Sequence, residues 1–139
     1  MEESPKKWLR TAILVAVVYL VAGLIFGALA GSAASHQMVV VWRLAAWVIS
    51  AAAFGAHIWY EHFRLRDSPR TTAWRASAAV ALGAFVLAVA ARVHAHRTGT
   101  GNPRLLTVAL VAWPFLSGLP AFVVAWVAAA GLASTRRTE

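Results

Sequence analysis

The sequence predicts an all-α integral membrane protein, a bundle of four transmembrane helices with both termini in the cytoplasm. First, 60% of its 139 residues are hydrophobic and 13% are charged, whereas soluble domains carry roughly 25% charged residues. Second, segments 11–42 and 105–135 contain no Lys, Arg, Asp or Glu, and a transmembrane helix needs about 20 mostly apolar residues. Third, short polar connections separate four apolar segments, which favours antiparallel packing of neighbours.

A single domain over residues 1–139 is expected to hold all four helices. Pro69 is interpreted as the stop signal that separates the second helix from the third. A glycine-rich stretch, 98–103, predicts a flexible turn before the fourth helix. The four helices are expected at about residues 8–31, 37–63, 72–94 and 105–133.

The basic residues predict the orientation in the membrane. With four spans both termini lie on one side, and that side carries Lys6, Lys7, Arg10, Arg64, Arg66, Arg70, Arg75, Arg136 and Arg137. The opposite side carries only Arg43, Arg92, Arg97 and Arg104. Because Lys and Arg accumulate on the cytoplasmic side, both termini are expected there. The frequent Ala, Arg and Val are typical of a GC-rich bacterium, so a multi-pass protein of the bacterial plasma (inner) membrane is expected.

The predicted outer side has basic residues without acidic partners. All five acids fall on the cytoplasmic side, namely Glu2, Glu3, Glu61, Asp67 and Glu139. The outer arginines either extend to lipid phosphates or form a site for an anion or an acidic partner surface. Both interpretations remain open at this point.

The second helix carries the most informative pattern. Polar and aromatic residues recur at alternating spacings of four and three, which places them on one stripe of the helix: Arg43, Trp47, Ser50, Phe54, His57, Glu61 and Arg64. In a membrane, a stripe of ionisable groups is expected to face the bundle interior or a water-filled cavity.

This stripe has a functional and a structural interpretation. In the functional one it lines a polar path, where His57 and Glu61 share a proton and Arg43, completed by Arg92, attracts an anion. In the structural one Ser50 and His57 bond across helices, and Glu61 pairs with Arg64. The binding or pathway residues we select are Arg43, Ser50, His57, Glu61 and Arg92.

Two further patterns concern packing and helix shape. Gly23, Gly27 and Gly31 repeat every four residues on the first helix and predict a face for close helix packing, within the bundle or between subunits. Pro114 and Pro120 are predicted to kink the fourth helix near mid-span. Interrupted helices mark binding sites in transporters, but proline kinks are also common in membrane helices.

The leading functional hypothesis is a small transporter or channel-like protein, working as a homo-oligomer or with other membrane subunits. One alternative is an accessory or structural subunit of a larger membrane complex, and another is a redox subunit that binds haem or quinone. An enzyme is not favoured, because no Ser-His-Asp arrangement, phosphate loop or carboxylate pair is present. Membrane lipids are expected partners. Neither a cofactor, a metal nor nucleic acid is expected, since the chain has no cysteine and its basic residues are divided between two faces.

Overall fold

A computed structural model describes residues 5–64 and 68–135, and this part of the chain consists of four helices and their connections. All four are long and apolar enough to cross a membrane, which confirms the predicted all-α class and agrees with a multi-pass membrane protein. They are α1 (Pro5–Gly31), α2 (His36–Arg64), α3 (Pro69–Thr98) and α4 (Pro103–Thr135).

Prolines and capping residues set where the helices begin. Three helices open with a proline, a position where its missing N–H costs no hydrogen bond and its φ already suits the helix. Ser68 and Asn102 stand directly before two of them, and their side chains accept hydrogen bonds from backbone N–H groups of the first turn. Pro69 and Pro103 therefore start helices, which explains why α3 begins earlier than the expected residue 72.

The α3–α4 turn is shorter than expected because α3 continues to Thr98. Gly99 ends the helix in the left-handed conformation, with φ of 66°, which glycine adopts without the steric cost of a Cβ. Its backbone N–H donates to the carbonyl of Ala95. Expected as a flexible turn, this segment is a defined helix cap followed by the Asn102 cap of α4.

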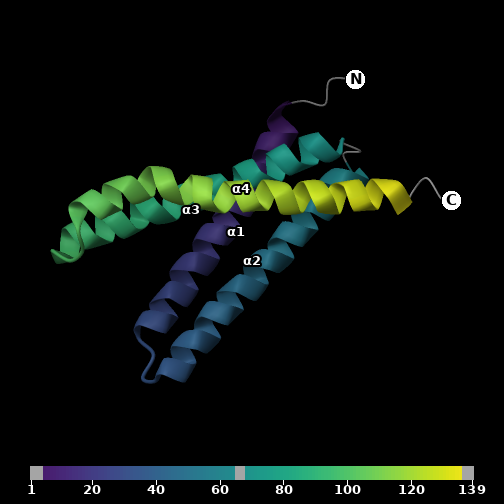
Figure 1. The fold of residues 1–139 in the computed structure, drawn as a ribbon. Coiled ribbons are helices and arrows are strands. Elements are labelled where there is room, and N and C mark those ends of the chain that lie inside the picture. The colour runs from purple at the N-terminus through teal and green to yellow at the C-terminus, as the bar shows by residue number, and fades with distance from the viewer. Residues whose placement is uncertain (1–4, 65–67, 136–139) are drawn as a thin grey trace.

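The helices form two antiparallel hairpins, α1–α2 and α3–α4, that cross one another (Figure 1). On the side of the crossing away from the two hairpin turns, the end of α2 lies near the start of α3, and α1 begins and α4 ends on this side as well; we call this the closed end. At the other end the two hairpin turns point in different directions, and we call this the splayed end. The α3 helix contacts all three others, whereas α1 and α4 do not touch within the described residues.

Glycines allow the close approach at the crossing. A Cβ on Gly83 of α3 would lie 3.1 Å from Cβ of Tyr19 on α1. One on Gly23 of α1 would lie 2.8 Å from a methyl group of Leu87 on α3. Within the second hairpin, a Cβ on Gly118 would lie 3.2 Å from Cβ of Ala81. The hairpins therefore meet where at least one partner has no side chain.

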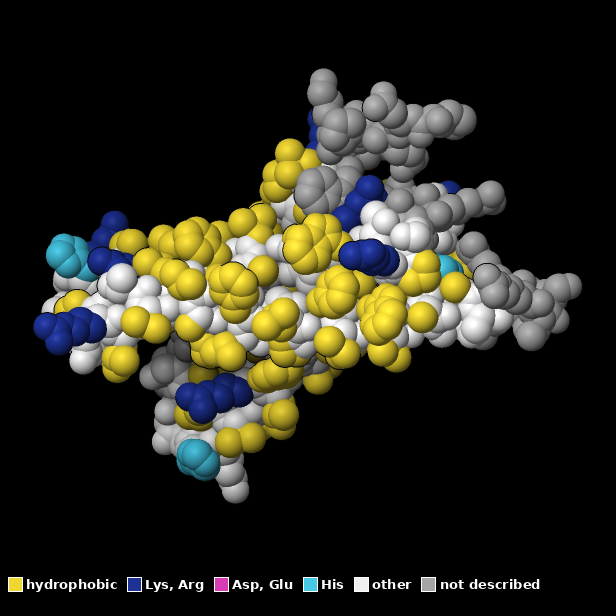
Figure 2. All heavy atoms as spheres, turned by 45° about the horizontal axis from the view of Figure 1, so that its top comes forward, with side chains coloured by type: hydrophobic (Ala, Val, Ile, Leu, Met, Phe, Trp, Pro, Cys, Tyr) yellow, Lys and Arg dark blue, Asp and Glu magenta, His cyan; other side chains and the backbone are white. Residues whose placement is uncertain are grey.

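Large apolar side chains cover much of the surface. On the face seen in Figure 2, hydrophobic side chains extend along the α3–α4 hairpin, while basic and histidine side chains gather near the ends of the helices. Valine and leucine side chains are exposed on all four helices, and exposed tryptophans occur on α2, α3 and α4. A soluble protein rarely leaves so large an apolar area in water, whereas lipid chains can cover it.

Candidate functional site

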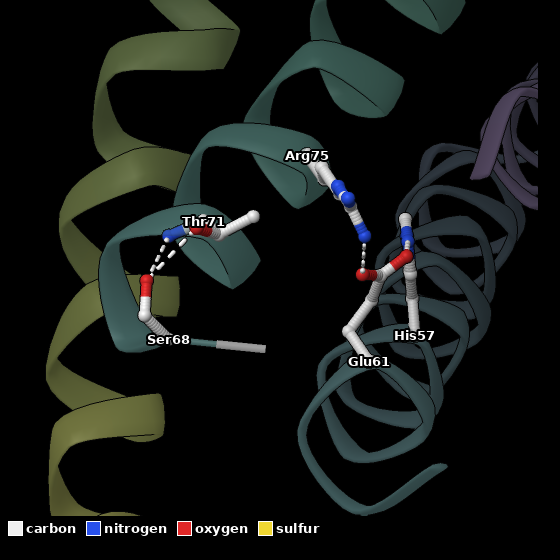
Figure 3. A network of polar contacts seen from close by, with 5 residues as sticks. All are labelled: His57, Glu61, Ser68, Thr71 and Arg75. Carbon is white, nitrogen blue, oxygen red and sulfur yellow. Dashed lines mark hydrogen bonds and ion pairs between the residues drawn. The ribbon is translucent and has the colours of Figure 1, made fainter. Parts of the chain in front are cut away.

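A cluster of ionisable side chains lies at the closed end, between α2 and α3. Nε2 of His57 lies 3.3 Å from Oε1 of Glu61 on the same helix. From α3, Nη1 of Arg75 donates to Oε2 of Glu61 at 3.2 Å. We call these three residues the closed-end cluster. Figure 3 shows Arg75 reaching from α3 to the carboxylate, which His57 approaches from the other side.

The local structure of both helices positions these groups. His57 and Glu61 are four residues apart, so they share one face of α2. Arg75 lies in the second turn of α3, and the first turn is fixed by Ser68, whose Oγ accepts a hydrogen bond from the Thr71 N–H at 3.2 Å. Because a short connection joins two antiparallel helices, the end of α2 and the start of α3 fall at the same depth in the bundle.

The cluster is removed from solvent. The side chains of His57 and Glu61 are 0% exposed, and that of Arg75 is 24% exposed. Burying a carboxylate is costly unless an opposite charge and hydrogen bonds compensate it. Arg75 supplies that charge from the other hairpin. Glu61 is also the only acidic residue in the described part of the chain.

Some buried polar atoms of this region have no hydrogen-bond partner among the described residues, and two of them concern the cluster and its surroundings. These two are Nδ1 of His57 and Oγ1 of Thr72, both buried. Most buried polar atoms in proteins are paired, so these two atoms are available to bind a proton, a water molecule or a polar ligand. When Nε2 of His57 carries its proton toward Glu61, the lone pair of Nδ1 can accept another.

A buried apolar core is built from residues that neighbour the cluster along α2 and α3. Ile58 of α2, Ala73 and Ala76 of α3 and Ala125 of α4 form a buried core. Phe54, Phe122 and Ala128 pack against this core while remaining partly exposed. The closed end therefore contains a packed apolar core as well as the buried side chains of His57 and Glu61.

The stripe predicted on α2 is buried only in part. Its closed-end members His57 and Glu61 are buried, Ser50 and Phe54 are half-buried, and Arg43 and Trp47 are exposed. Burial follows the crossing of the hairpins, because α3 and α4 cover α2 only toward the closed end (Figure 1). Glu61 pairs with His57 and Arg75 rather than with Arg64, which is exposed.

The predicted anion contact between Arg43 and Arg92 does not form in this arrangement. The two arginines lie on different hairpins, which diverge toward the splayed end (Figure 1). Arg92 donates instead to the hydroxyl of Thr107 on α4. Arg43 and Arg92 are therefore not placed together to bind one anion within this chain.

The predicted packing and kink residues also differ in their surroundings. Gly23 contacts α3, whereas a Cβ on Gly27 or Gly31 would meet nothing within 4 Å. The α4 helix runs without interruption through Pro114 and Pro120. The prolines therefore do not break α4 into two helices that could frame a binding site.

Sequence reasoning missed the roles of Arg75 and Thr72. Arg75 entered only the charge count for the orientation, although its depth could have been matched to that of Glu61. Glu61 lies three residues before the end of α2 and Arg75 six residues after the start of α3, a difference in depth that a long arginine side chain can span. Thr72 carried no signal, since a single threonine near a helix start is ordinary.

In the described part of the chain, no group of three or more His, Cys, Asp or Glu side chains is placed to hold a metal ion. Comparisons with protein-family models, with curated proteins and with solved structures found no match to this chain. The geometry of the closed-end cluster is therefore the basis for its functional interpretation.

Proposed function

We propose that this protein is a small multi-pass membrane transporter that moves protons, and that the closed-end cluster is its proton-binding site. The observation that supports this is the complete burial of Glu61 between His57 and Arg75 inside an apolar helix bundle. Ionisable residues within membrane helices are costly, and they commonly form proton relays. A purely structural contact at this place would cost less if it were apolar.

The atoms of the cluster suit reversible protonation. His57 faces Glu61 through Nε2 and keeps Nδ1 as a second nitrogen that can take up or release a proton. The carboxylate of Glu61 lies beside this imidazole and is a second group that can take up the proton. A proton on Glu61 instead removes its charge and weakens its bond to Arg75. Because that bond joins α2 to α3, proton binding is coupled to the contact between the two hairpins.

The proposal includes an orientation and a location. We propose that the closed end faces the cytoplasm of a bacterium, with the chain in its plasma (inner) membrane. The excess of Lys and Arg on the side of the termini supports this orientation. The cluster then binds protons near the cytoplasmic side, and the splayed end faces outward.

Proton flux into liposomes tests the function directly. The purified protein is reconstituted with a pH-sensitive dye inside, and a potassium diffusion potential drives proton entry. We expect wild-type flux above that of protein-free liposomes, and loss of this excess in His57→Gln and Glu61→Gln. His94→Gln, an exposed histidine at the splayed end, serves as the matched control. Equal flux in protein-free liposomes, or undiminished flux in His57→Gln, contradicts the proposal.

A second candidate is an accessory subunit of a larger membrane complex. It is favoured by the exposed half of the α2 stripe, where Arg43 and Trp47 lie uncovered by this chain. Gentle detergent extraction followed by native mass spectrometry separates the two functions. Other chains that co-purify, together with no proton flux by the isolated protein, favour the accessory subunit. A haem absorption band in the same sample would support the redox alternative.

A further inference from the structure

A groove lies between α1 and α2 near the splayed end, away from the closed-end cluster. Its volume is about 380 Å³, within the range of roughly 300–1,000 Å³ for small-molecule sites. One end of α1 and the facing part of α2 supply its walls. The lining includes Phe26, Gly27, Ala30, Gly31, Arg43 and Trp47.

The floor of the groove is bare backbone. A Cβ on Gly27 or Gly31 would meet no atom within 4 Å, whereas one on Gly23 would collide with Leu87. The face of α1 that carries the glycine repeat is therefore covered by α3 at Gly23 and uncovered at Gly27 and Gly31. Phe26 and Trp47 form aromatic walls, and the Trp47 side chain is largely uncovered, the residue being 76% exposed. A groove floored by glycines and flanked by aromatic side chains suits a hydrocarbon chain.

Arg43 gives the groove a positive charge. It lies seven residues after the start of α2, about 10 Å along the axis, so its side chain can reach the headgroup region of a bilayer from the hydrocarbon edge. No residue in 5–64 or 68–135 accepts a hydrogen bond from its guanidinium. The single acidic residue described there, Glu61, lies at the closed end.

A phosphate group is the counter-charge that fits this position. An arginine without a partner is costly at a membrane boundary, and its planar guanidinium binds phosphate oxygens in a bidentate manner. A second copy of this chain in the same orientation brings another Arg43 and no carboxylate to this depth, so its charge opposes docking here. A lipid of the same leaflet brings both the phosphate and the hydrocarbon chain.

We infer that this groove binds a phospholipid with a net negative headgroup, whose phosphate contacts Arg43 and one of whose acyl chains lies over Gly27 and Gly31 between Phe26 and Trp47. A net negative headgroup is favoured over phosphatidylcholine, because the choline group would bring a second positive charge to Arg43. This site is independent of the proposed proton transport, since it shares no residue with the closed-end cluster.

Native mass spectrometry of the detergent-purified protein tests this inference. The protein is titrated with phosphatidylglycerol and, separately, with phosphatidylcholine, and the lipid-bound fraction is measured. We expect one phosphatidylglycerol to bind more tightly than phosphatidylcholine. We expect Arg43→Gln to weaken phosphatidylglycerol binding by about tenfold or more, the usual loss for one charge-assisted hydrogen-bonded contact. Arg92→Gln, an exposed arginine bonded to Thr107, should leave binding unchanged.

A second variant tests the hydrocarbon part of the site. Gly27→Leu places a side chain on the open floor, so it should fold normally and reduce binding of both lipids. Thermal melting of each variant confirms folding. Equal phosphatidylglycerol binding by wild type and Arg43→Gln overturns the inference. A second contradicting outcome is that the protein forms a dimer which Gly27→Leu disrupts, while lipid binding does not change, because the groove would then bind a second copy of the chain. If millimolar inorganic phosphate, which has no acyl chain, displaces phosphatidylglycerol, the groove is an anion site rather than a lipid site, and the inference is also overturned.

Discussion

The two ends of the α2 helix present the same kind of stripe to opposite surroundings. At the closed end, His57 and Glu61 are covered by α3 and α4 and bonded to Arg75. At the splayed end, Arg43 and Trp47 are exposed beside an open groove. Equal spacing along a helix thus does not imply equal burial. The crossing point of the two hairpins decides which part of the stripe is buried and which part stays exposed.

The difference also separates two ways of compensating an ionisable group. Glu61 obtains its counter-charge within the chain, from the opposite hairpin. Arg43 has none in the described chain and is expected to find one in the bilayer. Substitutions at matched positions along α2 and at the crossing should therefore change the free energy of unfolding by unequal amounts.

The largest effect is expected at Glu61. Glu61→Ala removes the carboxylate that pairs Arg75 and His57, and leaves a charge at the closed end without its partner. Removing one member of a buried ion pair typically costs about 3–5 kcal/mol, so a loss of about 3 kcal/mol in unfolding free energy is expected. Denaturant unfolding in detergent micelles measures it.

A double substitution distinguishes lost pairing from lost packing. Glu61→Leu combined with Arg75→Met replaces the pair with apolar groups of similar size, and should recover most of the stability. Glu61→Leu alone should be nearly as unstable as Glu61→Ala. If the double variant is as unstable as both single ones together, the ion pair is not the reason for the loss.

A smaller difference is expected between two aromatic residues of the stripe. Phe54 packs against the buried core of the closed end, so Phe54→Ala should cost about 1.5 kcal/mol, less than the value for a fully buried phenylalanine. Trp47 is 76% exposed, and Trp47→Ala should change stability by less than about 0.5 kcal/mol. Thermal melting of both variants in the same detergent checks the order, and equal losses would contradict it.

Effects of opposite sign, each no larger than about 1 kcal/mol, are expected at two glycines. Gly83→Ala presses against Tyr19 at the crossing, where a Cβ lies 3.1 Å from its neighbour, and should cost about 1 kcal/mol. Gly27→Ala meets open space and should stabilise the helix by about 0.5 kcal/mol, because alanine loses less backbone entropy than glycine. Unfolding measurements on the two variants test this, and destabilisation by Gly27→Ala would show that another surface covers that face.

The sequence alone predicted the four helices and the polar stripe, because both depend on local patterns. Long apolar segments identify helices, and a spacing of three and four identifies a face. The sequence did not predict which half of the stripe is buried, since that depends on the contact of Gly83 with Tyr19 and of Gly23 with Leu87. It also placed helix starts after Pro69 and Pro103, because it treated these prolines as breaks rather than as first helical residues.

The partner of Glu61 shows the same limit of prediction from local sequence patterns. Arg64 is its neighbour at a helical spacing, and local reasoning selects it. The structure selects Arg75, which is fourteen residues away in sequence but lies opposite Glu61 across the connection. A contact between helices requires their relative depth and rotation, and the pattern of one helix contains neither.

If the chain spans a membrane as proposed, the crossing of the hairpins links its shape to bilayer thickness. Because the hairpins run in different directions, they cannot both stand along the membrane normal, so at least one must tilt. The helices have the length for this, since the 33 residues of α4 extend about 50 Å, whereas the hydrocarbon core of a bilayer measures about 30 Å. A thinner bilayer favours stronger tilt, and a thicker one favours more upright helices. The angle between the hairpins, and with it the opening of the splayed end, should therefore respond to the length of the lipid chains around it.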